Sequence, residues 1–452
     1  MRGLVGLSVL FCAVPMLAHA HASEQGFVLL LPTDFYVAGG AAVVALTIGL
    51  LAVAPSWRPD QLLRPVMQVP RSPIGIAPFT QIGALLAVLA LIGAGAWGPT
   101  DPLRNPLTLG FWTVFWIGIV AVQAVLFDIW RWVNPFTGLW RMLCALGIGV
   151  RPPLPTPSRW IGVALFLCFS GFLLADPAPA DPGRLAVLAL TYLGATGLAL
   201  ALFGRRWLIT GEFFTLFLRV YRRNAIFGPS SERIGLGVNG WRMIRLGTPP
   251  LATAGLMLLL LGSGSFDGVN ETFWWLGLLG INPLEFPGRS AVIVPTIAGL
   301  LVMNAALILA YSVSIRLGEV LARGDVPFGL AFCALAPSIL PIAAGYHVAH
   351  YLTSFLVDGQ HVISALFTAI GTGERPVTTG FFNRLDSVRI IWLAQAAAVV
   401  LGHVIAIVVA HAIAQRLYPT PRQATLSQLP LALFMVAYTV FGLWLLAAPK
   451  GA

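Results

Sequence analysis

The chain has 452 residues, of which 58% are hydrophobic and only 10% are charged. A soluble core cannot bury that much apolar surface, so the composition excludes a soluble globular protein and predicts a polytopic membrane protein. The net charge of +10 would suggest a nucleic-acid partner in a soluble protein, but basic cytoplasmic loops explain it here, and we expect no nucleic acid to bind.

Residues 1–20 are typical of a cleavable signal peptide. One arginine precedes an apolar run that ends in the small-x-small sequence Ala18-His19-Ala20. Cleavage after Ala20 would make His21 the first residue, and its α-amino nitrogen and imidazole would together form a chelating pair suited to Cu(II). Cleavage after Ala22 would remove that pair, and the sequence leaves both sites open.

Ten apolar segments are long enough to cross a bilayer, so we expect an all-α fold with about ten transmembrane helices in a single domain, residues 21–452. The segments are 35–55, 77–97, 107–127, 158–175, 184–204, 248–265, 289–314, 327–355, 388–414 and 427–447.

The loops between these segments alternate in charge. Arginines gather in every second loop, whereas most Asp and Glu residues lie in the others. Because cytoplasmic loops are enriched in Lys and Arg, the pattern predicts that both ends of the mature chain face outward. We further expect two segments, near 130–146 and 206–246, to lie along the cytoplasmic surface. Within the second, the apolar stretch 207–223 with its basic end is expected to form a helix along that surface.

A stripe of polar residues runs along the end of the eighth segment. On a helix, His347, His350, Ser354, Asp358 and His361 fall within an arc of about 80°. The two nearest histidines could share one metal ion. The last histidine lies about 21 Å further along and could join them only if the chain turns back, which Gly359 would permit. The alternative is a set of hydrogen-bonded histidines at the membrane interface, but three histidines and a carboxylate on one face favour a functional site.

An acidic loop is predicted on the same side, at residues 265–275. It places Asp267 and Glu271 above the outer membrane surface, beside two tryptophans typical of interfacial anchors. These carboxylates are either solvated loop charges or further metal ligands and a general base. The predicted topology brings this loop, His21 and the polar stripe to one face.

The remaining histidines, the cysteines and the absence of known catalytic motifs exclude several kinds of site. His403 and His411 are about 12 Å apart on one helix, too far to share an ion. The four cysteines are isolated, so neither a disulfide framework nor a Cys-x-x-Cys metal site is expected, and a metal would need His, carboxylate or Met ligands. The sequence has no G-x-S-x-G elbow, P-loop or H-E-x-x-H motif, which removes the signatures of a serine hydrolase, an ATPase and a zincin.

Three short motifs suggest a family. They are W-V-N-P-F-T-G-L-W at 132–140, F-D-G-V-N-E-T-F-W at 266–274 and H-V-A-H-Y-L-T-S-F-L-V-D-G-Q at 347–360. With them the chain resembles the polytopic bacterial membrane proteins called fenitrothion hydrolases, although the tract after Gln360 lacks the longer Asp- and Gly-rich segment of that family. The resemblance implies a hydrolase of aryl dialkyl phosphorothioate triesters in the bacterial inner membrane.

Three functions therefore stand as expectations. In the first, a divalent metal, copper or zinc, polarises a lipophilic triester and activates water. Its ligands would come from His21, His347, His350, Asp358 and His361, with Asp267 or Glu271 as the catalytic base. The second is a copper-handling membrane protein without hydrolase activity, and the third is a transporter. In each case the bilayer and a small lipophilic substrate or metal ion are the expected partners, and whether the protein is an enzyme is left open.

Overall fold

The computed structural model describes residues 27–53, 57–70, 75–148, 154–230 and 233–450. The predicted signal peptide and His21 lie outside the described residues. Helices make up most of the described chain, as the composition predicts.

The predicted transmembrane segments are helices. Within the described residues, nine helical stretches are long and apolar enough to cross a membrane, and the shorter helix α8, with 16 residues, occupies the remaining predicted segment, 158–175. The chain is therefore an all-α, multi-pass membrane protein. The main helices are α2 (Thr33–Val53), α3 (Ala77–Trp97), α8 (Trp160–Ala175), α9 (Pro182–Phe203), α11 (Leu251–Asn270), α13 (Ile293–Ala322), α15 (Leu340–Ala369), α16 (Leu385–Leu417) and α17 (Pro421–Ala447).

The third predicted segment is built differently from the others. It combines α4 (Pro106–Thr108), η1 (Leu109–Ile119) and α5 (Val120–Val125), and η1 is a π-helix of 11 residues. π-helical turns are rare in proteins, and those that occur are often located at functional sites. A second irregularity interrupts the eighth segment, where α14 (Phe328–Leu335) and α15 are separated by the 3₁₀ turn η6 (Ala336–Ile339), which contains Pro337.

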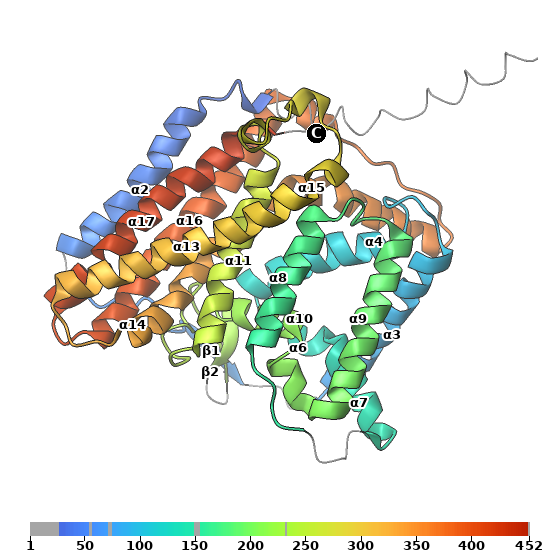
Figure 1. Cartoon of the computed structure of the whole chain (residues 1–452), viewed down its shortest axis with the longest axis horizontal. Coiled ribbons are helices and arrows are strands. Elements are labelled where there is room, and N and C mark those ends of the chain that lie inside the picture. Colours follow the sequence, from blue (N-terminus) through green and yellow to red (C-terminus); the bar gives the residue numbers. More distant parts are fainter. Residues whose placement is uncertain (1–26, 54–56, 71–74, 149–153, 231–232, 451–452) are drawn as a thin grey trace, which may run out of the picture.

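The helices form two groups with α11 and α15 between them (Figure 1). One group consists of α2, α13, α16 and α17, and the other contains α3, α8 and α9. α15 packs against α16 on one side and against η1 on the other, while α11 contacts both α13 and α8. The two central helices are therefore covered from both directions.

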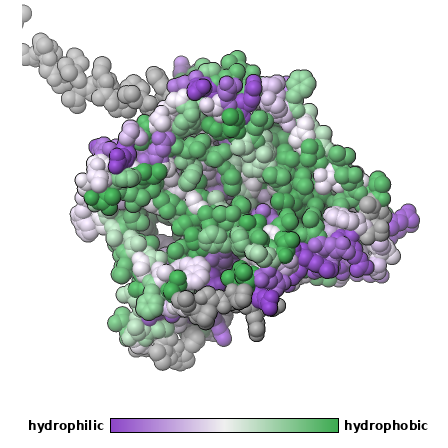
Figure 2. Space-filling view, turned by 180° about the vertical axis from the view of Figure 1, so that it is seen from behind, coloured by the Kyte–Doolittle hydropathy of each residue, from purple (hydrophilic) through white to green (hydrophobic). Residues whose placement is uncertain are grey.

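The outer surface is that of a membrane protein. Hydrophobic residues cover the middle of the face in Figure 2, and hydrophilic residues gather along its upper edge and at its lower right. Large apolar side chains such as Phe35, Leu188, Val302 and Leu433 are well exposed. Such a surface is stable only against lipid or another apolar partner.

Loops that the sequence assigns to one side contact each other. Arg104 pairs with Glu374, Arg184 with Asp176 and Lys450 with Glu271, all in the predicted outer loops. On the opposite side Arg416 donates to the carbonyl of Ile244 and Gln415 to that of Trp57. The alternation of sides therefore agrees with the charge pattern, while the side that faces outward stays a prediction.

The two predicted surface segments differ from each other. The first consists of α6 (Trp130–Val133) and α7 (Pro135–Ala145); α7 is a helix whose Arg141 is exposed and bonds Gln81 of α3.

Within 206–246, the helix expected at 207–223 is shorter than expected and is buried. The whole segment contains most of η3 (Gly204–Ile209), then α10 (Phe213–Tyr221), whose residues other than Arg219 are buried, and a hairpin of β2 (Phe227–Ser230) and β3 (Arg233–Leu236). β3 also pairs with β1 (Met67–Pro70), and all three strands are antiparallel. Phe213, Phe214 and Phe217 make aromatic contacts with neighbouring helices, and these contacts keep α10 packed inside the bundle.

Candidate functional site

Asp267 lies in a helix and not in a loop. α11 continues to Asn270, so the expected outer loop at 265–275 is wrong for its first half. The helix carries Asp267 into the interior of the bundle, where the residue is only 9% exposed. A buried carboxylate is expensive unless it is hydrogen-bonded or paired.

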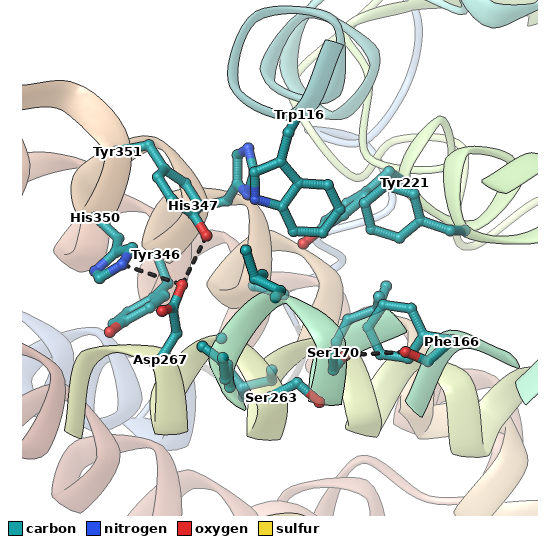
Figure 3. A pocket seen from close by; sticks show the side chains of 17 residues that line it. Trp116, Phe166, Ser170, Tyr221, Ser263, Asp267, Tyr346, His347, His350 and Tyr351 are labelled. Atoms are coloured by element: carbon teal, nitrogen blue, oxygen red, sulfur yellow. Dashed lines mark hydrogen bonds and ion pairs between the residues drawn. The ribbon is translucent and has the colours of Figure 1, made fainter. Parts of the chain in front are cut away.

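Two side chains of α15 supply those partners. The Tyr351 hydroxyl donates to Oδ2 of Asp267 at 2.6 Å, and Nε2 of His350 lies 3.1 Å from the same oxygen (Figure 3). The ring of Tyr346 stacks on His350 with centroids 5.6 Å apart. The carboxylate, imidazole and phenol therefore form one compact cluster that joins α11 to α15.

Tyr346 can reach this position because α11 has a glycine opposite it. A methyl group at Gly268 would overlap the Tyr346 hydroxyl. Glycine is the residue that permits such a close approach of a side chain to a helix backbone.

His347 is the second histidine of the site, and its surroundings differ from those of His350. It is 7% exposed, and among the described residues no group forms a hydrogen bond with its Nε2 atom. The ring of Trp116 meets it edge-on at 5.8 Å, and Tyr351 lies 4.9 Å away between the two histidines. Trp116 belongs to the π-helix η1, so the irregular helix forms one wall of the site (Figure 3).

A small cavity adjoins these side chains. Its volume is about 40 Å³, and its lining includes Asp267, His347, His350 and Tyr351 together with Ser170 and Ser263. Since a water molecule needs roughly 10–15 Å³ by this measure, the cavity has room for a few water molecules. An aryl dialkyl triester is far larger and does not fit in this conformation.

The outer half of the predicted stripe does not join the site. α15 runs without interruption from Leu340 to Ala369, so the turn that Gly359 would permit does not form, and His361 cannot share a metal ion with His347 and His350. Asp358 and His361 therefore stay about 16 and 21 Å beyond His347 along the helix axis. Both are half-buried.

Glu271 is likewise separate from the cluster. It follows the last residue of α11, its side chain is 48% exposed, and it lies 3.5 Å from Lys450 near the C-terminus. Of the two predicted catalytic carboxylates, the structure places only Asp267 with the histidines.

The described residues contain no group of three or more His, Cys, Asp or Glu side chains arranged to hold a metal ion. His350 and Asp267 are bonded to each other, which leaves His347 as the histidine with a free nitrogen at the cavity. The described part of the site thus fits a hydrogen-bonded network better than a complete ligand set for copper or zinc, which normally takes three or four protein ligands.

Other buried polar groups lie between the helices outside the Asp267 cluster. His403 of α16 is buried, its Nδ1 lies 2.9 Å from the carbonyl oxygen of Val399, and Nε2 has no hydrogen-bond partner among the described residues. Further along α16, His411 bonds Gln428 of α17 at 3.0 Å. Asn304 of α13 donates to Ser263 of α11.

Sequence reasoning missed the aromatic half of the site. Tyr351 could have been found, because its offset of four residues places it within about 40° of His347 on the helix. Trp116 carried no such signal, since one tryptophan in an apolar segment does not reveal a π-helix or its neighbour. The partnership of Asp267 with His350 joins residues 83 positions apart and depends on the packing of α11 against α15.

No protein family, curated protein or solved structure matches this chain in the comparisons. The function therefore has to be argued from the site itself.

Proposed function

We propose that the protein is a proton-coupled membrane transporter in which Asp267 and His350 form the proton-binding site. The observation that carries the proposal is a carboxylate that is bonded to a histidine and a tyrosine inside a transmembrane bundle, beside a cavity of water size. Ionisable groups within membrane spans are rare, and they typically mark ion pathways or proton relays.

The chemistry of the pair supports proton coupling. When the pair holds one proton, either as carboxylate and imidazolium or as carboxylic acid and imidazole, its net charge is zero. When the proton leaves, one negative charge remains among apolar side chains, which is strongly unfavourable. Proton binding therefore changes the free energy of burying this site, and a conformational change that exposes or buries it is coupled to the proton.

The backbone near the site offers places for such a change. The eighth segment is interrupted by η6 at Pro337, less than three turns before His347, and the third segment is π-helical where it meets His347. Discontinuous transmembrane helices are typical of transporter binding sites. Along α16, the buried His403 lies near the middle of the helix and the His411–Gln428 pair lies toward its predicted cytoplasmic end. A transporter needs polar groups on both sides of its site, whereas a one-sided enzyme does not.

The test uses the full chain reconstituted in liposomes that contain a pH-sensitive dye. With a potassium diffusion potential as the driving force, the wild type should carry protons into the vesicles faster than protein-free liposomes do. Asp267→Asn should abolish that flux, because an amide cannot bind and release the proton. Glu271→Gln is the matched control four residues along, and it should keep most of the flux.

Infrared difference spectra of the same proteins give a second measurement that does not need a cargo. The carboxyl C=O band of Asp267 should appear and vanish with pH in the wild type and be missing in Asp267→Asn. A wild-type flux no greater than the lipid background, together with the same infrared band in Asp267→Asn, would overturn the proposal.

Hydrolysis is a second candidate function, and one observation favours it. Nε2 of His347 has no hydrogen-bond partner among the described residues and lies at a cavity that can hold water. A neutral imidazole in that position can accept a proton from a water molecule that attacks a substrate. A lipophilic triester could approach from the bilayer, but the cavity would have to widen to admit it.

The two functions are separated by a turnover assay with fenitrothion on purified membranes. If the protein is a hydrolase, the wild type releases the nitrophenol and His347→Gln loses most of the activity, whereas His361→Gln keeps it. Absence of turnover in the wild type, with proton flux intact, would leave transport as the function.

A further inference from the structure

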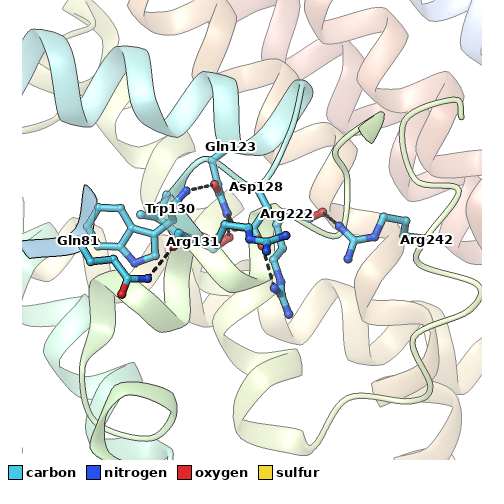
Figure 4. A network of polar contacts seen from close by, with 8 residues as sticks. Gln81, Gln123, Asp128, Trp130, Arg131, Arg222 and Arg242 are labelled. Atoms are coloured by element: carbon cyan, nitrogen blue, oxygen red, sulfur yellow. Dashed lines mark hydrogen bonds and ion pairs between the residues drawn. The ribbon is translucent and has the colours of Figure 1, made fainter. Parts of the chain in front are cut away.

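A cluster of arginines lies where α10 ends and the β2–β3 hairpin begins. Asp128, which precedes α6, accepts a hydrogen bond at 2.8 Å from Nη1 of Arg222 (Figure 4). The buried Gln123 donates to the other oxygen of Asp128 at 3.0 Å. The carboxylate is thereby fixed, and it fixes the first arginine.

The side chain of a second arginine packs against the hairpin. Arg242 is 3% exposed, and its Nη1 donates to the carbonyl of Arg222 at 2.8 Å (Figure 4). Its side chain crosses β2 at Gly228, where a Cβ atom would lie 2.5–2.6 Å from the Arg242 side chain. The hairpin is thus built around this guanidinium.

The cluster has an excess of positive charge. Arg219, Arg222, Arg223 and Arg242 interact electrostatically with one another, and Asp128 is the carboxylate that acts on them among the described residues. Burial and the neighbouring guanidinium groups of Arg222 and Arg219 lower the pKa of Arg223 from 12.5 to about 10. It stays charged at neutral pH, so four cations face one anion.

Part of the hydrogen-bonding capacity of the cluster is unused. Nε of Arg222 and Nη1 of Arg223 are buried and have no hydrogen-bond partner among the described residues. Buried donors are normally paired, and each exception calls for a partner such as an ion or water. Arginine groups pair well with the oxygens of a phosphate.

The surface beside the cluster is apolar. Arg159 interacts electrostatically with Arg219 and stands at the beginning of α8, whose next two residues, Trp160 and Ile161, are 51% and 40% exposed. A free phosphate gains nothing from such a surface. A phospholipid does, because its acyl chains can lie along α8 while its headgroup reaches the arginines.

We infer that Arg219, Arg222 and Arg223 form a binding site for the phosphate group of an anionic phospholipid, with Asp128 and Arg242 holding Arg222 in place. The site lies on the side that the loop charges assign to the cytoplasm. None of its residues belongs to the proton site, so the inference does not rest on the proposed function.

The test measures lipid binding to the full chain. The protein is delipidated in detergent and titrated with phosphatidylglycerol or phosphatidylcholine, and bound lipids are counted by native mass spectrometry. We expect phosphatidylglycerol to bind more tightly than phosphatidylcholine. Loss of one arginine near the surface should weaken phosphatidylglycerol binding by about fivefold, so Arg219→Gln and Arg223→Gln should each show a drop of that size.

Two further variants test the inference even if Arg223→Gln folds poorly. Arg223→Lys retains the charge and should retain most of the binding. Asp128→Asn keeps an oxygen that can accept the hydrogen bond from Arg222 but removes the negative charge that competes with the phosphate. It should therefore strengthen phosphatidylglycerol binding, the opposite direction from the arginine variants. Arg422→Gln, an exposed arginine at the start of α17 on the same predicted side, is the control and should bind like the wild type.

Either of two results would overturn the inference. One is equal affinity of the wild type for the two lipids. The other is phosphatidylglycerol binding that Arg219→Gln, Arg223→Gln and Asp128→Asn leave unchanged. A titration with inorganic phosphate distinguishes a lipid headgroup from a soluble phosphate as the ligand. If inorganic phosphate binds with the same dependence on Arg223 and the protein shows no preference for phosphatidylglycerol, the site binds a soluble phosphate and the lipid is refuted.

Discussion

The two halves of α15 carry similar residues in different surroundings. Its first half holds Gly345, His347 and His350 between α11, α16 and η1, and most of its side chains are buried. Its second half holds Gly359 and His361, and none of its residues from Ser354 to Ala369 is fully buried. The comparison teaches that one polar stripe on one helix becomes a site only where other helices surround it.

The largest effect is expected at His350, in the buried half of α15. His350→Ala removes the imidazole from a buried carboxylate, and breaking a buried pair of this kind costs about 3–5 kcal/mol. Unfolding of the detergent-solubilised variant by heat or SDS should show that loss of stability. A variant as stable as the wild type would mean that Asp267 does not depend on His350.

A glycine in each half of α15 tests the same difference in packing between the two halves. Gly345 faces the backbone carbonyl of Ala398 on α16, and a methyl group there would overlap it. Gly345→Ala should therefore push α15 and α16 apart and destabilise the fold by about 1–3 kcal/mol. The same unfolding assay checks this value, and an unchanged midpoint would contradict the close approach of the two helices.

Gly359→Ala should act in the opposite direction. A Cβ atom at this position meets nothing within 4 Å, and the residue lies inside an unbroken helix. Alanine is favoured over glycine in a helix by about 1 kcal/mol, so the variant should be slightly more stable than the wild type. If Gly359 were instead a point where the chain turns, the substitution would destabilise the protein.

The smallest effect is expected at His361. Its side chain is half-buried and far from the Asp267 cluster, so His361→Ala should change stability by no more than about 0.5 kcal/mol and leave proton flux intact. Flux measurements on His361→Ala and His350→Ala under one protocol compare the halves directly. A loss of flux in His361→Ala would extend the site along the whole stripe.

Much of the architecture could be predicted from the sequence. Apolar runs of about 20 residues identify membrane helices because the bilayer admits only segments whose backbone is internally hydrogen-bonded. Each of the ten predicted segments is a helix in the structure, and the loops pair with partners on their own predicted side. The short strands β1, β2 and β3 were missed, since runs of four residues with Gly and Pro give no clear period-two pattern.

The histidines His347 and His350 were found from their spacing alone, because residues on one face of a helix follow a fixed period. What the sequence by itself determined is therefore the set of helices, their alternation and the polar stripe on α15.

Only the tertiary structure decided which part of that stripe is a site. It buried Asp267 at the end of α11 instead of exposing it in a loop, and brought it to His350 and Tyr351. It also supplied Trp116 from a π-helix and left His361 outside. The reason is physical: a periodic pattern fixes the direction of a side chain from its own helix, whereas its partner and its burial depend on how separate helices pack against each other.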